Sequence, residues 1–221
     1  AMIGGNYNVI NGGAFTFMGG GNNNTLNGSR TYIIGGNANT ITNGVGGGII
    51  GGTTNTLSGS NDAANNMIGG SSNRLSVNGV IGATIIGGSD NKLFNVDTRG
   101  GDDRRLNYGA ILGGASNKIQ GATTDSNGSN AFPIIIGGKS NIISGAETPD
   151  TTNSGATIIN SFSSTIIPST GATIVGGSSN IISGKTDVVM LGASGRTATT
   201  SSATFVENLV VFNYAALDFA D

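Results

Sequence analysis

The carboxylates that could support catalysis lie in two short segments of the chain. Asp102–Arg105 reads DDRR, and Glu147 and Asp150 follow further along. Two carboxylates facing each other across a groove hydrolyse glycosidic bonds, but nothing in the sequence places two of these side chains across one. The chain contains no His and no Cys, which excludes serine–histidine and thiolate mechanisms. We therefore expect a protein without catalytic activity, and a polysaccharide-cleaving solenoid is a less favoured alternative.

Metal and cofactor sites are not predicted either. Calcium-binding β-rolls need an Asp that recurs at one register, whereas that register here carries Asn or Ser, apart from Asp90 before Asn91. The glycine runs 19–21 and 46–48 lack the Lys-Ser/Thr context and the helix of a phosphate loop. We expect no cofactor and no metal ligands.

The composition excludes further classes. Net charge is −2 and only 10% of the residues are charged, so there is no electrostatic case for binding nucleic acid. The apolar runs are far shorter than the ~20 residues of a membrane-spanning helix, and we expect no membrane insertion. Glycine fills 40 of 221 positions, yet 36% of the residues are apolar and recur at fixed positions, which favours an ordered repeat over disorder.

One pattern of two aliphatics, two glycines and an asparagine recurs through most of the chain. Thr31–Ile41 reads TYIIGGNANTI, and Ala172–Ile182 reads ATIVGGSSNII. The regular copies have a period near 16, and degenerate copies are centred on Asn160 and Gly192. A repeat of this length is typical of a solenoid in which each unit stacks on its neighbours. We predict one solenoid domain of about 11 rungs over residues 1–198.

Each part of the repeat has a structural role. The glycine pair permits positive φ at a corner, and stacked asparagines can form an amide ladder. Paired glycines and β-branched residues disfavour a helix. The predicted fold is all-β, a parallel β-solenoid or β-roll, with rungs ~4.8 Å apart and a total length of roughly 50 Å. The predicted ladder consists of Asn8, Asn24, Asn39, Asn55, Asn73, Asn91, Asn117, Asn141 and Asn180.

The two aliphatics before each glycine pair lead to a hypothesis about assembly. Consecutive strand residues point to opposite faces, so one column fills the interior and the other forms an apolar stripe that soluble monomers avoid. A homotrimer would bury that stripe in all its subunits. The alternative is a kink at the glycines that turns both columns inward. We assign the stripe between chains to the first position, namely Ile33, Ile49, Met67, Ile85, Ile111, Ile135 and Ile174.

The repeated IIGGxxNxI copies resemble the head repeats of trimeric autotransporter adhesins, and similar repeats occur in trimeric fibres of phage tails and contractile injection systems. The resemblance covers residues 1–198 and implies a left-handed parallel β-roll, with three rolls packed side by side or intertwined. Two features depart from the family: the period near 16 is longer than its usual repeat, and several rungs carry inserts.

Three inserts enter at the same position of successive repeats and span residues 94–110, 120–133 and 144–156. Insertions at one register emerge on one side of a solenoid, often the binding side. The first insert holds a candidate receptor loop for a glycan or protein, although the inserts can equally be tolerated decorations. That loop consists of Asp97, Arg99, Asp102, Asp103, Arg104, Arg105 and Tyr108.

The C-terminal segment, residues 199–221, breaks the repeat and is predicted to be an exit strand and cap leading to a following domain. Its aromatics Phe205, Phe212, Tyr214 and Phe219 are candidates to cover the open end of the solenoid.

We expect a structural segment of a phage or injection-system tail fibre, which acts as a rigid spacer and contacts a receptor. Its partners would be further copies of itself and other fibre or baseplate domains, and its place would be extracellular, on a virion tail or cell-surface appendage. The main alternative is the head of a bacterial trimeric autotransporter adhesin. An ice-binding solenoid is less favoured, because no threonine column persists beside the aliphatic that follows the asparagine.

Overall fold

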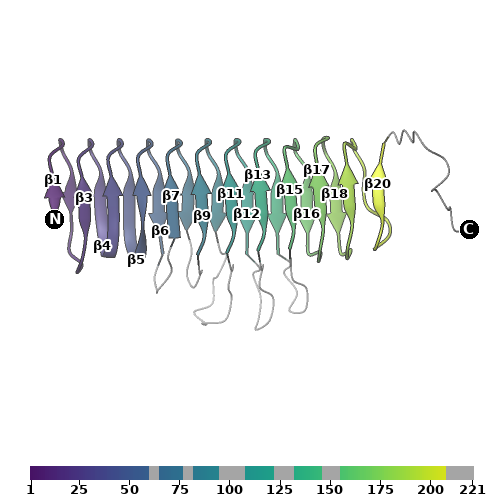
Figure 1. Cartoon of the computed structure of the whole chain (residues 1–221), viewed down its shortest axis with the longest axis horizontal. Coiled ribbons are helices and arrows are strands. Elements are labelled where there is room, and N and C mark those ends of the chain that lie inside the picture. Colours follow the sequence, from purple (N-terminus) through teal and green to yellow (C-terminus); the bar gives the residue numbers. More distant parts are fainter. Residues whose placement is uncertain (60–64, 77–81, 95–107, 122–131, 146–154, 208–221) are drawn as a thin grey trace, which may run out of the picture.

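The chain forms an elongated rod of stacked β-strands. The computed structural model describes residues 1–59, 65–76, 82–94, 108–121, 132–145 and 155–207. Within these ranges every regular element is a strand, and every pairing between strands is parallel. Figure 1 shows the strands side by side along one axis, from β1 at the N-terminal end to β20 at the other. The predicted all-β parallel β-solenoid is therefore confirmed.

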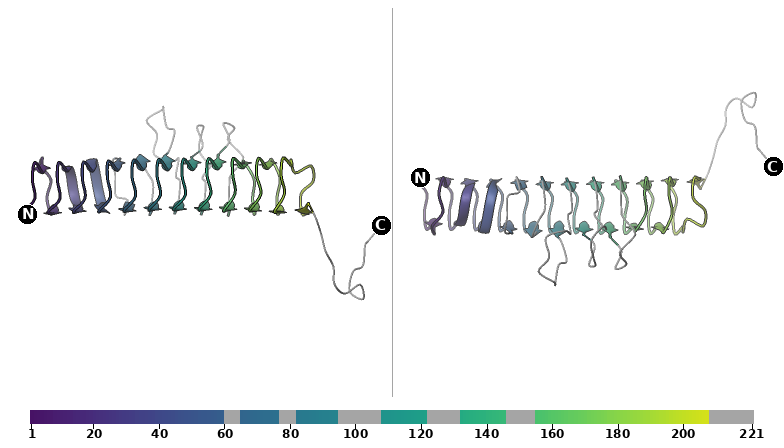
Figure 2. Two further views of the ribbon diagram at one scale, coloured as in Figure 1. Left: turned by 90° about the horizontal axis from the view of Figure 1, so that it is seen from above. Right: turned by 90° about the horizontal axis from the view of Figure 1, so that it is seen from below.

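The strands form two layers, seen as two rows in Figure 2. Layer A holds the strands before the glycine corners: β1 (Met2–Ile3), β3 (Phe17–Gly19), β7 (Asn65–Ile68), β9 (Thr84–Ile86), β11 (Ala110–Leu112), β13 (Ile134–Ile136), β15 (Thr157–Ile159), β17 (Thr173–Val175), β19 (Val189–Leu191) and β20 (Thr204–Val206). Layer B holds the strands after them: β2 (Val9–Ile10), β6 (Thr56–Ser58), β8 (Arg74–Ser76), β10 (Lys92–Phe94), β12 (Lys118–Gln120), β14 (Ile142–Ser144), β16 (Thr165–Ile167) and β18 (Ile181–Ser183).

Two longer strands connect the layers near the N-terminus. β4 (Thr25–Ile34) and β5 (Thr40–Ile50) begin in layer B and continue round the turn into layer A. Every other strand pairs within its own layer with the strands one rung away. Lys92 pairs with Arg74 on one side and Lys118 on the other, although the sequence separations differ. The inserts therefore leave the register of the rungs unchanged.

The core is a pair of facing aliphatic columns. In layer A the first of the two aliphatics before each corner points inward. In layer B the inward residue is the one that stands two positions after the asparagine of the repeat. Ile85 and Leu93 represent the two columns, and both are fully buried. The layer A column consists of Met18, Ile33, Ile49, Met67, Ile85, Ile111, Ile135, Ile158, Ile174 and Met190, and the layer B column of Leu26, Ile41, Leu57, Leu75, Leu93, Ile119, Ile143, Ile166 and Ile182.

The second glycine of each pair is required by a close backbone contact. A Cβ added to Gly88 would collide with the Asn91 amide nitrogen and the Gly114 carbonyl oxygen of the next rung, whereas one added to Gly87 would meet nothing within 4 Å. Both glycines have positive φ, 65° and 75°. Both positions favour glycine for its conformation, but only at the second position is there also no room for a side chain.

The solenoid extends beyond the boundary expected from the repeat. β20 stacks in parallel on β19, with Phe205 paired to Met190, and the partly buried Phe205 packs against the core. Residues up to Val206 therefore add a rung within the segment 199–221 that is predicted to be an exit strand and cap, and Phe205 is one of the aromatics predicted to cover the end of the solenoid. Phe212, Tyr214 and Phe219 lie outside the described residues.

Candidate functional site

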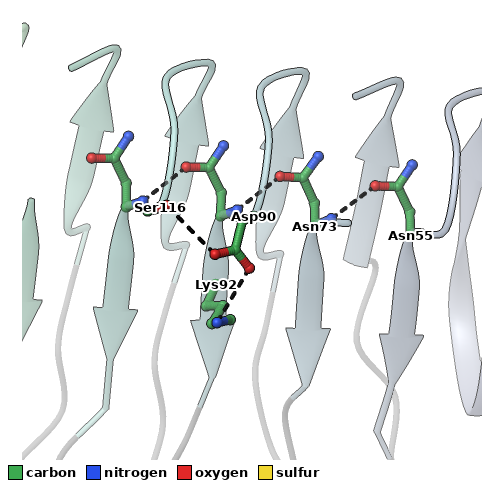
Figure 3. A network of polar contacts seen from close by, with 7 residues as sticks. Asn55, Asn73, Asp90, Lys92 and Ser116 are labelled. Atoms are coloured by element: carbon green, nitrogen blue, oxygen red, sulfur yellow. Dashed lines mark hydrogen bonds and ion pairs between the residues drawn. The ribbon is translucent and has the colours of Figure 1, made fainter. Parts of the chain in front are cut away.

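The predicted asparagines lie in one hydrogen-bonded column along the rod, and Figure 3 shows the section that contains Asn55 and Asn73. The Asn91 main-chain N–H donates to Asn73 Oδ1 at 3.0 Å, and Asn91 Oδ1 accepts from the Asn117 N–H at 3.0 Å. Asn91 Nδ2 donates to the carbonyl oxygens of Gly113 and Gly114, both at 3.2 Å. Each side chain therefore ties one corner to the next and satisfies its own buried polar groups. The role of this column is structural.

Two serines replace one asparagine in a degenerate copy. Ser164 stands at the asparagine position, where its N–H donates to Asn141 Oδ1 at 3.0 Å and its Oγ accepts from the Asn180 N–H at 3.1 Å. Ser161 Oγ donates to the Gly177 carbonyl at 3.2 Å and lies 2.6 Å from Ser164 Oγ. The donor and acceptor functions of one amide are thereby divided between two hydroxyls, and the column continues.

The column assigned to contacts between chains needs a correction. Ile33, Ile49, Met67, Ile85, Ile111, Ile135 and Ile174 are 0% exposed in the single chain, so they have no surface to offer another copy. The chain turns at the glycines so that the first aliphatic faces the opposite layer, and the second faces outward. The alternative with both columns inside is also wrong, because the second aliphatics remain exposed.

The outward surface of layer A, here called the A face, is uncharged in the described residues and combines a mostly apolar column with a partly polar one that includes Asn66, Thr84 and Thr173. Its principal column is the second aliphatic of each repeat, and its other column is the residue two before it. Within the described residues neither column contains Asp, Glu, Lys or Arg. The exposed members of the principal column range from 38% to 64%: Ile3, Ile34, Ile50, Ile68, Ile86, Leu112, Ile136, Leu191 and Val206.

Aromatic side chains lie flat against the A face instead of protruding from it. A Cβ placed on Gly48 would collide with the Tyr32 ring, which therefore covers that glycine. The Tyr32 hydroxyl reaches a further rung and donates to Asn66 Oδ1 at 2.9 Å. Phe17 similarly lies against Gly19, whose added Cβ would come 3.0 Å from the ring. These two rings therefore cover the glycines near the N-terminal end of the A face.

The candidate receptor loop is only partly described. Asp97, Arg99, Asp102, Asp103, Arg104 and Arg105 lie outside the described residues, as do Glu147 and Asp150. Tyr108 is described: its ring stacks on Phe132 with centroids 5.3 Å apart and planes inclined by 6°. Both rings are more than half exposed, at 52% and 56%, and both residues have positive φ.

Phe132 was not among the predicted site residues, although the sequence shows that it occupies the same position of the repeat as Tyr108. Tyr108 and Phe132 each stand three residues before the first aliphatic of their copies, Ile111 and Ile135. Rings at equal register in adjacent rungs must lie one above the other. A bulky residue in the left-handed region is strained, so the pair is a notable feature of the side from which the inserts leave.

Two kinds of feature are not found in the described ranges. No cluster of three or more His, Cys, Asp or Glu side chains occurs among them. In the same part of the chain, no helix is long and apolar enough to cross a membrane.

The fold and its asparagine column define a parallel β-solenoid whose exposed faces are the candidate sites. No family model, no curated protein and no solved structure matches the chain.

Proposed function

We propose that the chain is a rigid segment of a homo-oligomeric fibre whose copies pack through the A face. The observation that carries this proposal is the uncharged, mostly aliphatic outward column of the A face, which Gly19 interrupts and in which Ile86 and Ile136 are each 41% exposed. Exposed apolar strips of this extent mark interaction surfaces. Layer B differs, because its outward positions include Arg74, Lys92 and Lys118.

A further copy of this chain is the partner that fits the strip best. The apolar side chains repeat once per rung, every ~4.8 Å, and an identical chain repeats at the same spacing over the same length. Closed symmetry buries one strip per subunit and leaves none exposed. We take the assembly to be a homotrimer of left-handed rolls, side by side or intertwined, as the resemblance to trimeric fibre and adhesin repeats implies.

The proposed mechanism is mechanical. Main-chain hydrogen bonds join each rung to the next, and the asparagine column adds a side-chain tie at every corner, such as that from Asn91 to Gly113 and Gly114. A rod built in this way resists bending and can hold other domains apart. The rod would serve in an extracellular appendage, a phage or injection-system tail fibre or a bacterial adhesin head, joined to further fibre or baseplate domains.

Receptor contact belongs to the side that carries the inserts. The exposed Tyr108–Phe132 stack supports this assignment, since aromatic rings are common anchors in recognition surfaces. We assign no catalytic role to the chain.

Sedimentation equilibrium of the intact chain tests the assembly. We expect a single species of three times the 21.8 kDa chain mass, and negative-stain images should show straight rods. A folded species at the mass of one chain would refute the proposal.

A further inference from the structure

Three cations form an in-register column on the outer surface of layer B. Arg74, Lys92 and Lys118 pair as direct neighbours in β8, β10 and β12. The next residue of each strand, Leu75, Leu93 or Ile119, is fully buried, so the three cations all point outward. Their main chains are one rung apart, ~4.8 Å, and they form a straight line along the axis of the rod.

Such a column is unfavourable for the isolated chain, because like charges directly opposite each other on a sheet repel. The structure provides only partial compensation. Asp90 Oδ1 lies 3.2 Å from Lys92 Nζ, with both side chains about half exposed, and Lys118 Nζ lies 5.0 Å from the centroid of the Phe94 ring. Figure 3 shows Asp90 and Lys92 beside the asparagine column.

The described part of the rod carries more positive than negative side chains, although the whole chain has a net charge of −2. Its acidic residues are Asp90, Asp187 and Glu207, and its basic residues are Arg30, Arg74, Lys92, Lys118, Lys139, Lys185 and Arg196. Of these acids, Asp90 is the one paired with the column. The layer B surface therefore presents a positive line that lacks an equal number of fixed counter-charges among the described residues.

We propose that this column binds a linear acidic polysaccharide laid along the rod, with one anionic group per sugar. Successive anions on such a chain are spaced by one sugar ring, a length comparable to the height of one rung. The flanking outward column contributes Phe94 between Ser76 and Gln120. An aromatic ring offers a flat apolar surface to the C–H face of a sugar, and the cations supply charge-assisted hydrogen bonds to its carboxylate or sulfate groups.

A glycan fits better than nucleic acid. Tight binding to a nucleic-acid backbone generally uses many phosphate contacts spread over a groove, whereas this surface is a single line of three cations on a flat sheet. The site also does not depend on the proposed assembly, because layer B lies on the opposite side of the rod from the A face (Figure 2). Failure of either proposal would leave the other standing.

Isothermal titration of the intact chain tests the proposal with sodium polygalacturonate as a carboxylated probe, dextran sulfate as a sulfated probe and dextran as the neutral control. We expect binding of at least one anionic polymer, none of dextran, and weaker affinity at higher salt. The two anionic arms distinguish carboxylate from sulfate recognition. Failure of both anionic polymers to bind better than dextran would overturn the proposal, and so would tighter binding of oligo-dT of equal charge.

Substitutions locate the site. Lys92→Gln and Lys118→Gln should each lower the affinity by up to about fivefold, the upper end of the range for an exposed charge pair. Lys185→Gln, which removes a cation outside the column, should leave the affinity unchanged.

Asp90→Ser should raise the affinity, because it frees Lys92. Serine fits this corner, since Ser72 and Ser116 already occupy the equivalent corners with φ of 55°. An equal loss with Lys185→Gln, or no gain with Asp90→Ser, would contradict the assignment; circular dichroism checks that each variant folds.

Discussion

Ile85 and Ile86 are adjacent in β9, yet the Ile85 side chain is fully buried and Ile86 is 41% exposed. The same alternation recurs through layer A, for example at Ile135 and Ile136. One short strand thus supplies both the core of the single chain and the proposed contact with other chains. Substitutions at the two positions should therefore have separable effects.

Truncation of the inner residue should reduce the stability of each chain. Ile85→Ala removes buried methyl and methylene groups from a closely packed column and should cost about 2–5 kcal/mol. Ile86→Ala leaves no internal cavity and should chiefly weaken association between chains. Urea unfolding at several protein concentrations separates the two effects: the midpoint falls at all concentrations for Ile85→Ala, whereas for Ile86→Ala the fall grows on dilution. Equal behaviour of the two variants would contradict the assigned orientations.

The asparagine column should be sensitive to loss of a single amide. Asn91→Ala leaves the Asn117 N–H and the carbonyls of Gly113 and Gly114 without their side-chain partner. Unpaired buried polar groups are costly, and we expect a loss of about 2–4 kcal/mol in urea unfolding. Asn37→Ala is the control, since it removes only an exposed amide contact with Asn22 and should change stability little. Comparable losses would show that burial of the column does not matter.

The two glycines of one corner should differ in tolerance. Gly87→Asn should cost within about 1 kcal/mol, because asparagine accepts the left-handed region and Asn160 occupies this register with φ of 46°. Gly88→Ala should cost about 2–5 kcal/mol, because its Cβ would meet the Gly114 carbonyl oxygen as well as imposing strain. Thermal unfolding followed by circular dichroism measures both; the reverse order would show that the corner geometry is different.

The serine pair that replaces an asparagine should be energetically coupled. The hydroxyls of Ser161 and Ser164 are hydrogen-bonded to each other at 2.6 Å, and together they make the hydrogen bonds that one asparagine amide makes in the other rungs. In a double-mutant cycle of Ser161→Ala and Ser164→Ala, we expect a coupling energy of about 1 kcal/mol. Additive effects would mean that the two hydroxyls act independently.

Much of the fold follows from the period of the repeat. The glycine corners, the asparagine register and the alternation of each aliphatic pair are local patterns, so the solenoid could be predicted. Which aliphatic of each pair faces inward could not be predicted, because Ile85 and Ile86 are equally apolar. The direction of the turn depends on the φ of Gly87 and Gly88. The stacking of Thr204–Val206 as a further rung does not follow from the repeat, because that copy lacks both the glycine pair and the asparagine.

The sites could be predicted less well than the fold. Both sites arise only when copies separated by inserts are aligned in space. They are the stacked pair of Tyr108 and Phe132, and the line of Arg74, Lys92 and Lys118. The sequence does hold a signal for the cations, since each directly follows a column asparagine: Asn73, Asn91 or Asn117.

The most direct test of the central claim is the mass of the chain in solution before and after a charge is placed on the A face. Ile86→Lys should convert a trimer into separate folded chains in sedimentation equilibrium, because the ammonium group would have to be buried unpaired at the interface. Ile181→Lys is the matched control: it changes an aliphatic of 40% exposure on layer B and should leave the trimer intact. A trimer that persists with Ile86→Lys, or a wild-type chain that sediments as a folded monomer, would contradict the account.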